Sequence, residues 1–286
     1  MDILKAKAWA PGTCGELVEG AIDGKTFQIT CPIDIGSTIQ INRNGAGFPK
    51  EFPKTAKAIE LVATKLNLPV KELSFERDSK LLPGKGMGSS TADITAALLA
   101  AGRLAGKELS SKELASLALS IEPSDGIMFR GAVIFDCWEG QWFEELGEAP
   151  SLNILVVDPG GIVDTIAFNQ ADAFKYYNSR KEAQVKIALR LVKEGILEKD
   201  LEKIGRGATE SALANQELLP KPDLPMLINW AKEIKALGVN VAHSGTVMGL
   251  LLATDGPHPE EIMTYLKKKK PEWDYCPTRL INGGLK

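Results

Sequence analysis

The chain has 286 residues, of which 44% are hydrophobic and 25% are charged, as in an ordinary water-soluble globular protein. Its formal net charge of -3 at pH 7 argues against a nucleic-acid-binding protein, because such proteins usually carry a basic surface. No stretch is long and apolar enough for a transmembrane helix, and the N-terminus lacks the apolar core of a signal peptide. We therefore expect a cytoplasmic protein with no nucleic acid and no membrane as partner.

The cysteines and histidines predict neither a zinc site nor a disulfide framework. The four cysteines form no Cys-x-x-Cys pair, and the two histidines are too few and too far apart in sequence for a metal cluster. This usage is typical of reduced thiols in the cytoplasm.

Hydrophobic periodicity predicts alternating strands and helices in the first half of the chain. The dipeptide Pro11-Gly12 is expected to end the first strand. In chain order the predicted elements are β-rich segments at residues 5–10, 27–30 and 38–42, a helix at 54–66, a strand at 73–77, helices at 91–104 and 111–120, and a β-rich stretch at 131–138.

The second half is mainly helical after one fully apolar strand. The predicted elements are a strand at 152–157, helices at 172–194, 198–213 and 224–236, a strand at 247–253 and a helix at 259–269. The change in pattern near residue 150 predicts two α+β domains, 1–150 and 151–286.

A glycine- and serine-rich loop precedes the helix predicted at 91–104, and we expect it to bind phosphate. Its alternate glycines let backbone N–H groups approach an anion, and the helix N-terminus adds further unsatisfied donors. Ser90 and Asp93 match a Ser-x-x-Asp capping pair for that helix. The simpler alternative is a flexible turn between strand and helix. The predicted phosphate contacts are Pro83, Gly84, Lys85, Gly86, Met87, Gly88, Ser89 and Ser90.

Two common phosphate motifs do not fit this loop. It is not a Walker A loop, because no Gly-Lys-Ser/Thr closes a run of the correct spacing. It is not a G-x-G-x-x-G loop either, because the third glycine comes one residue early.

The loop instead resembles the signature of the GHMP kinases, in the form P-x-G-x-G-M-G-S-S-T-A-D. Residues 10–16 and 242–249 resemble the N-terminal and C-terminal glycine-containing blocks of the same family. Within the family, the Cys-Gly-Glu, Glu-Pro-Ser-Asp and His-Ser-Gly-Thr segments are most similar to the L-threonine kinases of cobalamin synthesis. The resemblance implies a two-domain α+β GHMP kinase fold, with an N-terminal domain like ribosomal protein S5 domain 2 and a ferredoxin-like C-terminal domain.

The resemblance also implies a chemistry, with ATP and Mg2+ as cofactors and a small hydroxyl compound, L-threonine, as substrate. Ser90 and Glu122 are the implied magnesium ligands, and Asp125 is the implied base for the substrate hydroxyl. Asp125 either accepts the proton or only orients the hydroxyl, and Ser124-Asp125-Gly126 also fits an ordinary turn. Lys85 is either an additional charge for phosphate or a solvated loop lysine.

An amino-acid substrate requires one site for its ammonium group and one for its carboxylate. Glu16 is either the site for the ammonium group or a surface residue, and backbone N–H groups of residues 12–15 are candidates for the carboxylate. His243 is either a substrate contact or a structural residue, and Cys14 has no neighbouring histidine in sequence that would make it a nucleophile. The predicted substrate-binding residues are Thr13, Cys14, Gly15, Glu16, His243, Ser244, Gly245 and Thr246.

Several alternatives stay open at the level of sequence. The same fold phosphorylates homoserine, pantoate or isoprenoid alcohols in other members of the family, and a kinase fold can also act as a sensor that binds nucleotide without turnover. The sequence leaves a homodimer open and does not identify the residues that separate threonine from homoserine, which differ only in the position of one carbon.

Overall fold

The computed structural model describes residues 3–286 except 44, 46, 162–170, 218, 243 and 244, and residues 171–179 by their backbone only. The predicted substrate contacts His243 and Ser244 lie outside the described residues. Within the described part, no helix has the length and apolar character to cross a bilayer.

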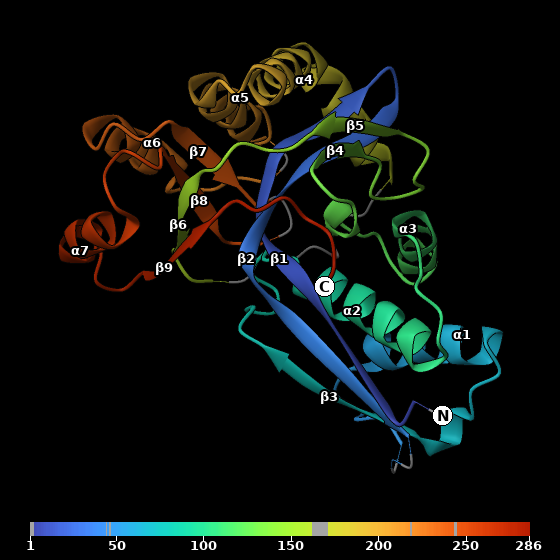
Figure 1. Cartoon of the computed structure of the whole chain (residues 1–286). Coiled ribbons are helices and arrows are strands. Elements are labelled where there is room, and N and C mark those ends of the chain that lie inside the picture. Colours follow the sequence, from blue (N-terminus) through green and yellow to red (C-terminus); the bar gives the residue numbers. More distant parts are fainter. Residues whose placement is uncertain (1–2, 44, 46, 162–170, 218, 243–244) are drawn as a thin grey trace.

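A nine-stranded antiparallel sheet runs through the described chain (Figure 1). The spatial order is β5-β4-β2-β1-β7-β8-β6-β9, and β3 pairs with the other end of β2. The strands are β1 (Lys5–Ile22), β2 (Lys25–Arg43), β3 (Leu73–Ser79), β4 (Ala132–Phe135), β5 (Phe143–Gly147), β6 (Asn153–Asp158), β7 (Gly238–Val241), β8 (Met248–Leu252) and β9 (Asp274–Arg279).

The long hairpin of β1 and β2 lies in the middle of the sheet. It differs from the prediction in one respect. Pro11-Gly12 does not end the first strand, because β1 continues to Ile22 through three register shifts between Pro11 and Val18. Such irregularities leave residues unpaired, so a proline without an N–H group is tolerated there. The segments predicted separately at 27–30 and 38–42 are likewise parts of one strand, β2.

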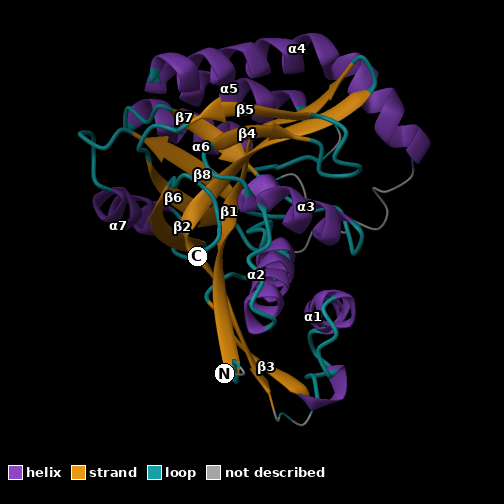
Figure 2. Cartoon of the chain, turned by 45° about the vertical axis from the view of Figure 1, so that its right-hand side comes forward, coloured by secondary structure: helices purple, strands orange, loops and turns teal. Residues whose placement is uncertain are grey.

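The helices pack on different parts of the sheet (Figure 2). Helix α2 (Ser89–Leu104) packs on β1 and β2, with α1 (Pro53–Lys65) and α3 (Ser111–Leu119) against it. Helices α4 (Ala171–Glu198) and α5 (Leu201–Ala214) pack on one another and on β1. Helix α6 (Leu224–Glu233) contacts β7, and α7 (Pro259–Lys269) contacts β6 and β9. Two 3-10 turns, η1 (Val70–Glu72) and η2 (Gly126–Met128), complete the described elements.

Two clusters of buried side chains form the core. The larger draws residues from both halves of the chain, from Ala8 to Leu280. The smaller lies entirely in the second half, between Leu155 and Trp273. The division into domains 1–150 and 151–286 remains a proposal, supported by the second cluster and by the position of β6 directly after residue 150.

Candidate functional site

The glycine-rich loop takes a backbone course that glycine makes possible. Gly84, Gly86 and Gly88 have φ angles of 73°, 83° and 61°, a region that L-residues with a side chain rarely adopt. Gly88 is the N-cap of α2 and provides no side-chain cap. The loop therefore delivers the chain to the helix with the first N–H groups of α2 uncapped by a side chain, as an anion site requires.

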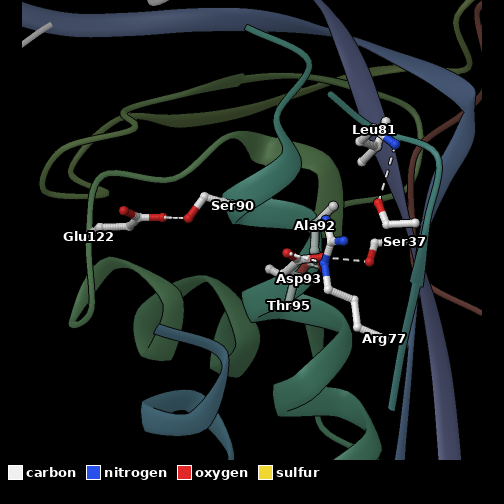
Figure 3. A network of polar contacts seen from close by, with 9 residues as sticks. Ser37, Arg77, Leu81, Ser90, Ala92, Asp93, Thr95 and Glu122 are labelled. Atoms are coloured by element: carbon white, nitrogen blue, oxygen red, sulfur yellow. Dashed lines mark hydrogen bonds and ion pairs between the residues drawn. The ribbon is translucent and has the colours of Figure 1, made fainter. Parts of the chain in front are cut away.

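The predicted capping pair of Ser90 and Asp93 is wrong. The Asp93 carboxylate accepts hydrogen bonds from Ser37 Oγ at 2.5 Å and from Arg77 Nε at 2.8 Å instead. Figure 3 shows Asp93 pointing toward Arg77 and Ser37, whereas Ser90 points toward Glu122. These contacts anchor the N-terminal half of α2 to β2 and β3, because Ser37 and Arg77 belong to those strands.

Ser90 and Glu122, the two predicted magnesium ligands, are joined directly by a hydrogen bond. Ser90 Oγ donates a hydrogen bond to Glu122 Oε1, and the Lys54 ammonium group forms an ion pair with Glu122 Oε2. Glu122 lies after α3, and Lys54 lies in the first turn of α1. Three separate helical segments therefore meet at one carboxylate.

The Ser90 and Glu122 oxygens fit a magnesium ion by their chemistry. Both are hard oxygen donors, and Mg2+ in nucleotide sites takes one or two protein oxygens and fills its other positions with phosphate oxygens and water. Glu122 already holds a cation, the Lys54 ammonium group. Within the described residues no group of three or more histidine, cysteine or acidic side chains forms a complete metal cage.

Asp125 lies beside the loop on the same side as the first block. Its Oδ1 accepts a hydrogen bond from Gln28 Nε2 at 2.9 Å, and its backbone N–H donates to Thr91 Oγ1 at 3.3 Å. A Cβ atom on Gly88 would lie 2.9 Å from Asp125 Oδ2 and 3.0 Å from Thr13 Oγ1. The carboxylate therefore lies immediately beside the N-cap of α2.

The environment of Asp125 favours its protonated form. Burial raises the pKa of its carboxyl to about 7, and the negative charges of Glu16, Glu19 and Glu122 act in the same direction. The hydrogen bond from Gln28 lowers the pKa and only partly offsets them. A carboxyl that titrates near neutral pH is suited to exchange a proton with a substrate hydroxyl.

The first predicted substrate block, residues 13–16, lies along the glycine-rich loop. The Thr13 backbone N–H donates to the Met87 carbonyl at 2.9 Å, and Thr13 Oγ1 donates to the Gly86 carbonyl at 3.5 Å. Gly15 has a φ of 55° and abuts Val241. Glu16 is buried at 8% exposure and pairs in the sheet with Val241.

Cys14 is no nucleophile in this structure. Its side chain is fully buried, and burial raises the pKa of its thiol well above the usual range. The Asn240 side chain donates to the Cys14 carbonyl, which fixes the bulged part of β1 against β7. The lack of nucleophilic character therefore agrees with the sequence analysis.

The described part of the C-terminal block, Gly245 and Thr246, contacts the loop directly. The backbone N–H groups of Thr246 and Val247 both donate to the Lys85 carbonyl, at 3.0 and 3.1 Å. A Cβ atom on Gly245 would lie 2.2 Å from the Gly86 nitrogen, so only glycine fits there. The structure thus brings together all three blocks that the sequence singled out, as far as they are described.

Lys85 is paired within the protein. Its Nζ lies 2.9 Å from Asp158 Oδ2 and donates to the Gly161 carbonyl at 3.0 Å. Asp158 also accepts a hydrogen bond from Thr246 Oγ1 at 2.6 Å. Burial raises the pKa of the Asp158 carboxyl. The hydrogen bonds from Thr246 and Lys85 lower it by more, so that the pKa lies below its usual value.

Several residues of the site escaped the sequence analysis. Gln28 lies within a strand, and Lys54 and Lys221 are lysines in segments with no motif. Asp158 carried a signal that could have been used, because a carboxylate at the end of a fully apolar strand and before Pro159 is typical of a site residue. Only the folded chain shows that these side chains face the loop region.

Comparison with known proteins agrees with this geometry. Residues 54–130 match the GHMP kinases N terminal domain. The chain is 31% identical to an L-threonine kinase of Citrobacter freundii, over 98% of this chain and 99% of that protein. It is 32% identical to an L-threonine kinase of Salmonella typhimurium, over 86% of this chain and 83% of that protein.

Solved structures with the same fold include two other kinases. A homoserine kinase from Cytophaga hutchinsonii superposes with a TM-score of 0.75 at 18% identity, covering 100% of this chain and 97% of that chain. The mevalonate kinase of Methanococcus jannaschii superposes with a TM-score of 0.73 at 17% identity, covering 97% and 98%. At these identities the likeness establishes the fold and leaves the substrate open.

Proposed function

The chain belongs to the GHMP kinase family and is a small-molecule kinase, and we propose that it transfers the γ-phosphoryl group of ATP to the hydroxyl of L-threonine. The observation that carries the proposal is the position of Asp125 and of the Ser90–Glu122 pair, both beside the uncapped N-terminus of α2. The full-length similarity to two L-threonine kinases supports the choice of substrate.

Phosphoryl transfer requires positioning and charge stabilisation more than covalent chemistry by the protein. In the proposed reaction the threonine hydroxyl oxygen bonds to the γ-phosphorus, the bond from that phosphorus to the β,γ-bridging oxygen breaks, and ADP leaves. The N–H groups of the loop and of the first turn of α2 bind the phosphate oxygens. Ser90 and Glu122 hold magnesium, which neutralises charge on the phosphates when bound.

Asp125 takes the proton of the hydroxyl in this proposal. An alcohol is a weak acid, so the proton leaves late, as the new oxygen–phosphorus bond forms. The hydrogen bond from Gln28 at 2.9 Å fixes the orientation of the carboxylate. With a pKa of about 7, Asp125 is partly ionised at neutral pH and regains its charge readily.

The threonine ammonium group binds at Glu16 in this proposal. Glu16 is buried and lies within electrostatic reach of Asp125, since its charge raises the pKa of that residue. The product is then O-phospho-L-threonine, which we propose supplies the aminopropanol linker of cobalamin. Restored cobalamin-dependent growth of a strain that lacks its own threonine kinase would support this role, and failure of the active enzyme to restore growth would contradict it.

A substrate panel tests the reaction itself. ADP formation is measured with threonine, homoserine, pantoate and an isoprenoid alcohol in the presence of ATP and Mg2+. We expect turnover with threonine to exceed that with every other compound. If another compound alone is phosphorylated, the protein is still a kinase, but its substrate is that compound and not threonine. Nucleotide binding by calorimetry without ADP formation from any compound would identify a sensor and overturn the proposal.

A further inference from the structure

A buried lysine lies directly behind the C-terminal block of the site. Lys221, in the segment between α5 and α6, is 6% exposed. Its ammonium group donates a hydrogen bond to the Gly245 carbonyl. Gly245 in turn lies against the glycine-rich loop, because a Cβ atom there would be 2.2 Å from the Gly86 nitrogen. Lys221 therefore brings a positive charge to within one residue of the phosphate loop.

The surroundings of this ammonium group are incomplete. Within the described residues, its one hydrogen bond goes to a neutral carbonyl oxygen, although an ammonium group has three N–H donors. A buried cation is unfavourable unless a negative group or several acceptors compensate it. Burial lowers the pKa of Lys221 to about 8, and the charges of Glu16 and Glu19 oppose that decrease.

The same acidic residues connect Lys221 with the predicted base. The charge of Glu16 acts on Asp125 and on Lys221, so Glu16 is within electrostatic range of both. An α-amino acid carries an ammonium group and a carboxylate on one carbon atom. Glu16 and Lys221 carry the complementary pair of charges. Both lie next to the C-terminal block, since Glu16 pairs with Val241 and Lys221 donates to the Gly245 carbonyl.

We infer that Lys221 binds the carboxylate of the amino-acid substrate while its hydroxyl faces Asp125. The inference rests on the proposed kinase function and adds the group that recognises the acid. It also replaces the backbone N–H groups of residues 12–15 as the main carboxylate site, because the N–H group of Thr13 already donates to the Met87 carbonyl. A carboxylate at Lys221 supplies charged acceptors to an ammonium group whose one described hydrogen bond goes to a neutral carbonyl oxygen.

A second buried lysine provides a matched control. Lys181 in α4 is 8% exposed, and its ammonium group donates to Asn215 Oδ1. Asn215 also donates to the carbonyls of Glu19 and Ser211, so this lysine is part of the packing of α4 and α5 on β1. Lys181 makes no described contact with the glycine-rich loop or with Gly245.

The test compares L-threonine with L-threonine amide, in which a neutral group replaces the carboxylate. For the wild-type enzyme we expect kcat/KM to be much higher for the acid. In Lys221→Met this preference should fall by about 10- to 100-fold, the loss expected for one charge-assisted hydrogen bond. Lys221→Arg should restore part of the preference, and Lys181→Met should retain it whatever its stability.

Two results would overturn the inference. If Lys221→Met lowers kcat/KM for acid and amide equally, Lys221 only positions Gly245. If the wild-type enzyme does not distinguish the acid from the amide, the site does not recognise a carboxylate. If the wild-type enzyme phosphorylates a different hydroxy acid, only the choice of threonine as substrate is wrong. The comparison of acid and amide is then made with that hydroxy acid. A wild-type enzyme that accepts only alcohols without a carboxylate contradicts both proposals.

Discussion

Lys85 Nζ lies 2.9 Å from Asp158 Oδ2, so an ion pair connects the glycine-rich loop of the first half to the end of β6 in the second. Asp158 is almost fully buried, at 4% side-chain exposure, and also accepts a hydrogen bond from Thr246. The Asp158 carboxylate thus connects the glycine-rich loop with the C-terminal block and fixes their relative position. Lys85 is thus paired rather than fully solvated, and its role as an additional charge for phosphate stays a prediction.

Replacement of this carboxylate should loosen the phosphate loop. Asp158→Asn removes the charge that pairs with Lys85 but keeps an acceptor for Thr246. We expect a loss of about 1–3 kcal/mol in the free energy of unfolding and a higher KM for ATP, because the loop is less well held. Urea denaturation and steady-state kinetics measure the two effects. Unchanged stability together with an unchanged KM would show that the ion pair has no structural role.

The Asp158 pair should also contribute to acid sensitivity. The folded state lowers the pKa of Asp158 below its reference value of 3.8, so its stabilising contribution is present above 3.8 and is lost as the pH falls through the lowered value. The asparagine of Asp158→Asn does not titrate, so it gains no proton as the pH falls through this range. The difference in stability between wild type and variant should therefore shrink as the pH falls below about 3.8. A difference that stays constant over this range would contradict the assignment.

The contact between Ser90 and Glu122 predicts a metal phenotype. Ser90→Ala removes one oxygen of the proposed magnesium site, and Glu122→Gln removes its negative charge. We expect both variants to need roughly 10-fold or more Mg2+ for half-maximal activity, with the larger increase for Glu122→Gln. Rates are measured over a range of Mg2+ concentrations at fixed ATP.

Ser120, two residues before Glu122 in the sequence, controls for the loss of a hydroxyl group in the same segment. Ser120 lies at the end of α3, and among the residues that the structure describes its Oγ donates to the Leu117 carbonyl alone. Ser120→Ala should keep the wild-type magnesium dependence. An equal shift in Ser120→Ala, or no shift in Ser90→Ala, would contradict the proposed ligand set.

The elements predicted best are those whose signal is local in the sequence. Helices α1 and α7 were predicted almost to their observed ends, because a proline starts each of them and the apolar residues recur at helical spacing. The strands β5, β7 and β9 were missed. β7 has only four residues, and β9 contains Pro277 and owes its conformation to pairing with β6.

The same distinction separates the two parts of the site. The glycine-rich loop was predictable, because its glycines, hydroxyls and following helix are consecutive. The groups that face it were harder to identify, since Gln28, Asp158 and Lys221 come from a strand interior, a strand end and a connecting segment. The capping prediction for Ser90 and Asp93 failed because Arg77 and Ser37, which bind Asp93, are brought there by β3 and β2.

Gly245 should tolerate no side chain. A Cβ atom there would lie 2.2 Å from the Gly86 nitrogen and 2.3 Å from the Lys85 carbonyl oxygen, and neither backbone atom can move without displacing the loop. Gly245→Ala should lower the free energy of unfolding by about 1–3 kcal/mol, as for other overpacked sites, and weaken ATP binding. Calorimetric titration with ATP and thermal unfolding measure these effects.

Gly256 provides the matched control for this substitution. A Cβ atom at Gly256 would meet its nearest atom, the Ala253 carbonyl oxygen, at 3.3 Å, so a small shift accommodates it. Gly256→Ala should change the stability by no more than about 0.5 kcal/mol and leave ATP binding unchanged. Wild-type ATP affinity in Gly245→Ala would mean that the C-terminal block does not set the position of the loop.

Protonation of Asp125 should lower the reaction rate at acidic pH. Its carboxyl must be ionised to accept the hydroxyl proton, so kcat/KM should fall as the pH decreases through about 7, the raised pKa of this group. Gln28→Leu removes the hydrogen bond that lowers this pKa, and should move the limit to higher pH. Asp125→Asn should lower kcat by about 100- to 10,000-fold, the usual contribution of a general base. A pH profile without a limit near 7, or one that Gln28→Leu does not shift, would show that Asp125 only orients the hydroxyl.

The same carboxyl should reduce the stability of the folded enzyme at neutral and alkaline pH. The folded state raises the pKa of Asp125 from 3.8 to about 7. As the pH rises between these two values, Asp125 ionises in the unfolded chain before it ionises in the folded one, so the free energy of unfolding decreases. The decrease is complete above about pH 7. Asp125→Asn keeps an acceptor for Gln28 and carries no charge that must be buried. We therefore expect this variant to unfold at a higher urea concentration than the wild type above about pH 7 and to lose that advantage toward about pH 4. A variant that is less stable than the wild type above pH 7 would contradict the raised pKa, whatever its activity.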